Sequence, residues 1–141
     1  MKLSALVAAL FPAILFVTKV TPAHPQVAPI QVETLAQSTS SWDGAAYKEY
    51  PAGQPQLTIL RMTIPPHTTL QWHSHPMPNA GYLLSGDLTV EKRDGTKKHF
   101  RAGQVIAETV GSIHRGTTGD RPVVLIVFYP GVPGLPLSQP R

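Results

Sequence analysis

Three histidines are the residues of this chain best suited to chemistry. His73 and His75 are separated by one residue. Side chains on a strand alternate between its two faces, so both imidazoles point the same way, about 7 Å apart along the chain. His114 follows a turn at Gly111, and a third imidazole would complete a facial set on one divalent ion. The alternative for His114 is an ordinary histidine at the edge of a strand.

The elements that must position these histidines are predicted to be strands. After the first 23 residues no stretch shows a useful helical period, whereas short runs rich in Val, Ile, Leu, Thr and Tyr alternate with Gly and Pro. This pattern indicates an all-β sandwich or barrel. The expected strands span residues 56–64, 69–75, 81–91 with a bend at Gly86, 104–108, 114–118 and 123–129, with a hairpin turn at Asp94-Gly95.

Two motifs around the histidines resemble those of the cupin superfamily. The first family motif places His-x-His three or four residues before a glutamate and a glycine six residues further on, and residues 73–86 match it from His73 to Gly86. The second motif is matched over residues 103–118, with its histidine at His114. The resemblance implies a single small jelly-roll barrel of the quercetin-dioxygenase-like kind. It also implies a metal held by His73, His75 and His114.

The departures from the motifs concern the site itself. Asn79 stands where the family has its glutamate ligand, and Thr109 and Thr118 replace the proline and asparagine of the second motif. An amide oxygen can coordinate a metal but brings no charge, so Asn79 is a weak or absent fourth ligand. Imidazoles suit several metals, and the cofactor is expected to be one divalent ion among Fe, Mn, Zn, Ni and Cu.

Glu108 is the acid of the second motif region, six residues before His114. It is a candidate catalytic residue, either as a general base or as a group that orients a ligand imidazole. The alternative is a carboxylate at the rim, paired with Arg115 or another base.

The chain is expected to be divided into four parts. Residues 1–23 combine Lys2 with an apolar run too short to span a bilayer comfortably, as a signal peptide does, with cleavage after Ala23. An uncleaved anchor is the alternative. Residues 24–52 are expected to be an extended segment with an edge strand over 32–41, residues 53–131 the barrel, and residues 132–141 an irregular tail. The run at 123–129 suits a strand buried on both faces.

Composition and context narrow the partners. The chain contains no cysteine, which excludes thiolate metal sites and thiol nucleophiles. Basic residues flank the Asp94-Gly95 turn, but an exported protein, periplasmic or secreted, rarely meets nucleic acid, and no stable membrane insertion is expected after cleavage. The resemblance favours a homodimer. Three functions follow: a metal-dependent dioxygenase-like or isomerase-like enzyme on a small molecule, a non-catalytic metal or small-ligand binding module, or a barrel with vestigial histidines.

Overall fold

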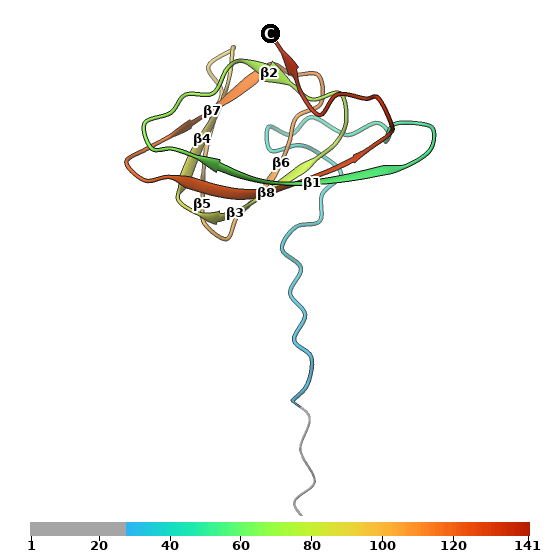
Figure 1. Ribbon diagram of the computed structural model, residues 1–141, viewed down its shortest axis with the longest axis horizontal. Coiled ribbons are helices and arrows are strands. Elements are labelled where there is room, and N and C mark those ends of the chain that lie inside the picture. Colours follow the sequence, from blue (N-terminus) through green and yellow to red (C-terminus); the bar gives the residue numbers. More distant parts are fainter. Residues whose placement is uncertain (1–27) are drawn as a thin grey trace, which may run out of the picture. The chain divides into compact units, whose positions relative to one another are not determined.

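The structure is a computed structural model that describes residues 28–141 (Figure 1). The predicted signal peptide and its cleavage site lie outside these residues. The chain divides into two units, residues 1–32 and 33–141, and residues 28–32 of the first are exposed and without regular structure. In the described part no helix is long and apolar enough to cross a membrane.

Nine strands form two antiparallel sheets over residues 33–141, which confirms the all-β jelly-roll expectation. One sheet has the order β1-β8-β3-β6 and the other β5-β4-β7-β2-β9 (Figure 1). The strands are β1 (Gln56–Ile64), β2 (His73–Ser74), β3 (Ala80–Ser85), β4 (Asp87–Lys92), β5 (Lys97–Arg101), β6 (Val105–Ala107), β7 (His114–Thr118), β8 (Val123–Gly131) and β9 (Gln139–Pro140).

Gly86 divides the strand expected over residues 81–91 into two strands of different sheets. Its φ is +78°, a conformation that residues with a Cβ rarely adopt, and an added Cβ would collide with the carbonyl of Pro122. β3 therefore pairs with β8, whereas β4 pairs with β7. The expected bend is in fact the corner at which the chain changes sheets.

The core lies between the sheets and follows from alternation along the strands. On β1, Leu60, Met62 and Ile64 turn inward while Ile59 is 64% exposed, as the alternation of side chains along a strand requires. β8 was expected to be buried on both faces, and this is wrong. Phe128 is exposed, and burial alternates along the strand, because the outer face of this sheet is only partly covered.

The edge strand expected over residues 32–41 does not form. Only an isolated bridge joins Ser40 to Ala46, and the Ser38 hydroxyl instead binds backbone atoms of Ser40. Such local side-chain bonds compete with strand pairing. The following residues fasten this segment to the barrel: the N–H of Trp42 donates to the carbonyl of Ala107 (2.8 Å), and its ring packs edge-on against Phe100.

The tail is irregular only as far as Ser138. Gln139 and Pro140 form β9, which pairs with β2 at the sheet edge, so an irregular tail up to residue 141 is a wrong prediction. Proline is compatible with an edge strand because the outer side of such a strand forms no backbone hydrogen bonds with another strand.

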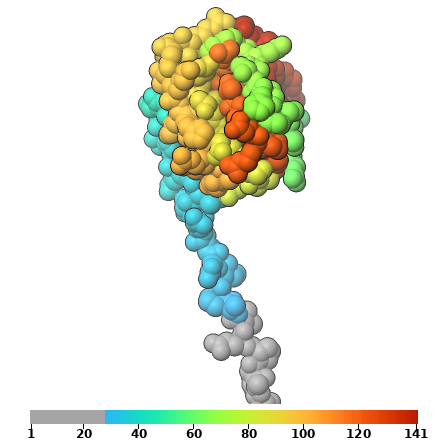
Figure 2. All heavy atoms as spheres, turned by 90° about the vertical axis from the view of Figure 1, so that its left-hand side faces the viewer, coloured from blue at the N-terminus to red at the C-terminus, as the bar shows by residue number. Residues whose placement is uncertain are grey.

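At the end of the barrel seen in Figure 2, the green loop after β1 lies against the red-orange loop before β8. There the N–H of His67 donates to the carbonyl of Gly119 (2.9 Å).

Candidate metal centre

Strand pairing brings the three predicted histidines together from two motifs. His73 of β2 pairs directly with His114 of β7. His75 forms a parallel bridge with Val110, and its carbonyl accepts the N–H of Gly111 (2.8 Å). Gly111 has a φ of +71°, which fits the predicted turn and lets the chain close around His75 before it reaches His114.

The three imidazoles face one another. Their ring centroids are separated by 4.5 Å for His73 and His114, and by 5.1 Å for each of the other two pairs. Each ring offers a ligand nitrogen, and these nitrogens all lie within 4.8 Å of one another. His75 and His114 are buried, while His73 is partly exposed.

Each ring is held through its Nδ1 by a backbone carbonyl. The partners are Gln71 for His73 (2.8 Å), Leu137 for His75 (2.8 Å) and Ser112 for His114 (3.0 Å). A carbonyl only accepts hydrogen bonds, so each Nδ1 carries the proton and each Nε2 keeps its lone pair. This arrangement is typical of metal-ligating histidines, whose other ring nitrogen is fixed in this way.

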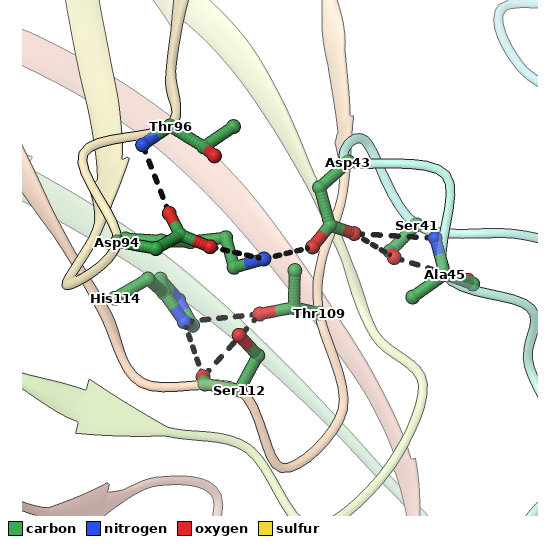
Figure 3. Close-up of polar contacts among 9 residues, drawn as sticks. Ser41, Asp43, Ala45, Asp94, Thr96, Thr109, Ser112 and His114 are labelled. Carbon is green, nitrogen blue, oxygen red and sulfur yellow. Dashed lines mark hydrogen bonds and ion pairs between the residues drawn. The ribbon is translucent and has the colours of Figure 1, made fainter.

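Thr109 gives His114 additional support. Its hydroxyl lies 3.1 Å from Nδ1 of His114, in a fully buried position (Figure 3). Thr109 occupies the proline position of the second motif, so this departure places a polar side chain beside a ligand.

Burial and one carboxylate set the charges of the site. Burial lowers the pKa of His73 and of His75 below the usual value, which favours the neutral form that binds metals. For His114, burial also lowers the pKa, but the neighbouring Glu108 carboxylate outweighs it, and the pKa is raised. For Glu108, burial raises the pKa, but the opposite effect of His114 and the other two imidazoles is larger. The pKa of Glu108 therefore lies below its usual value.

Glu108 points into the site. Its Oε2 is 3.3 Å from Nε2 of His114, yet neither atom has a hydrogen-bond partner, and both are buried. Arg115 pairs instead with Glu91 on the outer face of the second sheet, where it also lies over the ring of Trp72 at 4.3 Å. The alternative in which Glu108 pairs with Arg115 is therefore wrong.

Asn79 is buried beside this group. Its Nδ2 donates to the carbonyl of Met77 (3.2 Å), while its Oδ1 has no hydrogen-bond partner. His67 and His99, the other two histidines of the barrel, are exposed and lie away from the site.

A cavity of about 240 Å³, the mouth of the site, opens onto His73 and His75. Tyr129 lies on its wall, 5.8 Å from His75 between ring centroids. The sequence placed Tyr129 only in the strand expected over residues 123–129 and Ser138 in an irregular tail, but both line this mouth. The alternation of β8 would have turned Tyr129 inward with Val127; the contribution of the tail has no comparable signal in the sequence.

The family comparison agrees with this geometry. The cupin domain matches residues 60–129, from β1 to near the end of β8. These residues are a cupin domain. The match includes all three histidines, Asn79 and Glu108, and it leaves out the segment before residue 60 and the tail that supports His75.

Solved structures give the same fold. The cupin-like protein from Thermotoga maritima has a TM-score of 0.53 at 17% identity, over 60% of this chain and 64% of its own. The DMSP lyase DddQ from Ruegeria pomeroyi has 0.52 at 19%, over 59% and 42%. The polyketide cyclase RemF from Streptomyces resistomycificus has 0.52 at 20%, over 60% and 59%. The chain spans less than half of the lyase, and similarity at this level shows the fold alone. No curated protein matches the chain.

The residues of this cupin fit a metal ion. Three imidazoles with protonated Nδ1 atoms turn their Nε2 atoms together, and the buried Nε2 of His114 and Oε2 of Glu108 have no other partner. Buried polar atoms without a partner are costly, and a divalent cation satisfies both of them.

Proposed function

We propose that this cupin holds one divalent transition-metal ion on His73, His75 and His114 and uses it to bind and convert a small molecule. The observation that supports this most strongly is the set of three backbone carbonyls, from Gln71, Leu137 and Ser112, that orient the three rings. Metal-ligating histidines almost always have their other ring nitrogen fixed by such a partner, and here all three do.

When bound, a divalent metal polarises an oxygen of a substrate and orients it for reaction. The chain's own residues prepare that step. The histidines come from one side of the barrel, and the mouth leaves access past Gln71, Met62 and Tyr129. Glu108 supplies a carboxylate beside His114, suited either to accept a proton from the substrate or to bind the metal. A dioxygenase-like or isomerase-like reaction uses these parts.

The second candidate is a binding module without turnover. It is favoured by the size of the mouth, about 240 Å³, which is below the usual range of roughly 300–1,000 Å³ for ligand pockets. A metal with one small ligand fills such a space. The enzyme hypothesis therefore requires a substrate of few atoms or one that reaches beyond the mouth.

Metal analysis of the purified protein tests the shared part of both candidates. We expect about one metal per chain and its loss in His114→Ala. The control is His99→Ala, which removes an exposed histidine outside the site and should keep the metal. Retention of stoichiometric metal by His114→Ala would refute the three-histidine site. Oxygen uptake and product analysis with iron- or manganese-loaded protein then separate the enzyme from the binding module.

We also propose export and a dimer. The apolar run of residues 3–17 after Lys2 supports export as a signal peptide, and mass spectrometry of the mature N-terminus tests cleavage after Ala23.

The outer face of the β1-β8-β3-β6 sheet carries exposed Leu57, Ile59 and Phe128, an apolar face suited to a second copy of the chain. Sedimentation of the wild type and of Ile59→Lys tests the dimer, and an unchanged monomer in both refutes it.

A further inference from the structure

Asn79 and Glu108 lie opposite each other, one residue beyond the paired ends of the neighbouring strands β3 and β6. β3 and β6 pair with Ala80 opposite Ala107, and one step further the N–H of Glu108 donates to the carbonyl of Asn79 (2.9 Å). Directly opposite residues on antiparallel strands project from the same face, with Cβ atoms about 5 Å apart. A carboxylate at 108 therefore starts from the same face as a carboxylate at 79 would, about 5 Å away.

Both side chains are turned into the barrel. Asn79 is 5% exposed, and the Glu108 side chain is 13% exposed. Each has a buried oxygen without a hydrogen-bond partner, Oδ1 of Asn79 and Oε2 of Glu108. Buried oxygen atoms without a hydrogen-bond partner are costly, and the guanidinium of Arg115 is held by Glu91.

The contact between Glu108 and His114 has the spacing of two ligands on one ion. Two donor atoms each about 2.1 Å from a metal lie about 3.0 to 3.4 Å apart at octahedral or tetrahedral angles. Oε2 of Glu108 and Nε2 of His114 are 3.3 Å apart. The Glu108 carboxylate thus contacts His114, but it is not among the ligand atoms that all lie within 4.8 Å of one another.

The backbone of Glu108 is fixed on both sides. Its N–H is bonded to Asn79, and its carbonyl accepts the hydroxyl of Tyr47 (2.7 Å). Tyr47 lies in the segment before the residues that match the family. This chain thus holds the position of Glu108 with a residue of its own N-terminal segment, as a metal ligand requires.

We infer that Glu108 is the fourth protein ligand of the metal, supplied from the strand next to the one on which the first motif carries its glutamate. The inference rests on the proposed three-histidine site. It assigns Glu108 to the ion rather than to free general-base duty, and leaves Asn79 as its neighbour. A carboxylate added to three imidazoles also shifts the expected metal toward ions that accept oxygen ligands, such as Fe²⁺, Mn²⁺ and Zn²⁺.

The test measures Zn²⁺ affinity by competition with a chromophoric chelator, together with the visible spectrum of the Co²⁺-loaded protein. Changing the partner of a ligand costs about 10- to 100-fold in affinity, so Glu108→Gln should cost at least about 100-fold. It should also change the Co²⁺ spectrum. Asn79→Ala, at the position opposite Glu108, is the matched control and should change the affinity and the spectrum little.

The double variant Asn79→Glu/Glu108→Gln makes the test specific. It moves the carboxylate from position 108 to position 79, directly opposite, and we expect it to restore most of the affinity lost in Glu108→Gln. Glu108→Asp, which keeps the charge on a shorter side chain, should lie between the wild type and Glu108→Gln and guards against a folding defect of the amide variant.

The outcomes separate the two proposals. Metal bound by Glu108→Gln with wild-type affinity and an unchanged Co²⁺ spectrum overturns the fourth-ligand inference and leaves the three-histidine site intact. A wild type that binds no metal overturns the proposed function itself. Loss of affinity in Asn79→Ala equal to that in Glu108→Gln also overturns the inference, because the two positions would then act only through the structure they share.

Discussion

The Nδ1 of His75 lies 2.8 Å from the carbonyl oxygen of Leu137, 62 residues further along the chain. This bond holds the proton on Nδ1 and turns Nε2 toward His73 and His114. The segment that supplies it lies after the residues that match the cupin domain. The C-terminal segment is therefore part of the metal centre, both through this carbonyl and through β9, which borders β2.

Removal of residues 137–141 should weaken metal binding. Without the Leu137 carbonyl the His75 ring loses its orientation, and we expect Zn²⁺ affinity to fall about 10- to 100-fold. A chain that lacks only residues 139–141 keeps this carbonyl but loses β9, so its thermal stability should fall while most of the affinity remains. Equal affinities in the two truncated proteins would show that the carbonyl does not contribute.

Tyr47→Phe tests the support of Glu108 from the N-terminal segment. The variant loses the hydrogen bond to the Glu108 carbonyl, which should reduce the free energy of unfolding by about 1 kcal/mol, and it should also lower Zn²⁺ affinity. Tyr50→Phe is the control, since Tyr50 is 66% exposed. Urea denaturation and chelator competition measure the two effects. A Tyr47→Phe protein as stable and as tight as Tyr50→Phe would contradict this role.

The histidines could be predicted because their spacing is a local property. His73 and His75 are two residues apart, and side chains at this spacing on a strand point to the same face. The turn at Gly111 before His114 is also visible in the sequence. The structure brings all three together. On β1 the structure puts Leu57 and Ile59 on the face opposite Leu60 and Met62, because a regular strand leaves each residue only two faces.

What the sequence did not reveal depends on contacts between distant segments. That Glu108 faces His114 rather than Arg115 follows from the pairing of β6 with β3 and of β7 with β4, which no local pattern specifies. The tail reaches His75 across 62 residues, and its prolines indicate only an irregular chain. Residues 32–41 had the pattern of a strand, but their serines bond locally instead.

Gly86→Ala should be among the most destabilising single substitutions in the barrel. The φ of Gly86 is positive, and a Cβ would meet the backbone at Pro122 and Val123, which cannot move without disturbing β8. We expect a loss of about 3 kcal/mol or more in the free energy of unfolding. Gly95→Ala has a similar φ of +87° but open space around it, so its cost should stay near 1 kcal/mol. Equal losses would show that the close approach has no effect.

Asp43 should make the protein more stable near neutral pH than in acid. Burial raises its pKa, but hydrogen bonds from Lys92, Ser41 and the N–H of Ala45 outweigh this and lower the pKa from 3.8 to about 2 (Figure 3). The folded state thus binds a proton less readily than the unfolded state. The resulting stabilisation, about 2 kcal/mol, is fully present above about pH 4 and is lost as the pH falls toward 2.

Asp43→Asn isolates this contribution. The ion pair with Lys92 (2.8 Å) disappears in the variant, so urea denaturation should show it less stable than the wild type by about 2 kcal/mol at about pH 6. The difference should shrink as the pH falls below about 4, since the wild-type carboxylate is then protonated during unfolding. Asp120→Asn, at a side chain that is 96% exposed, is the control and should match the wild type. A constant difference between Asp43→Asn and wild type from about pH 6 to about pH 2.5 would mean that packing, rather than the charge of Asp43, stabilises this corner of the barrel.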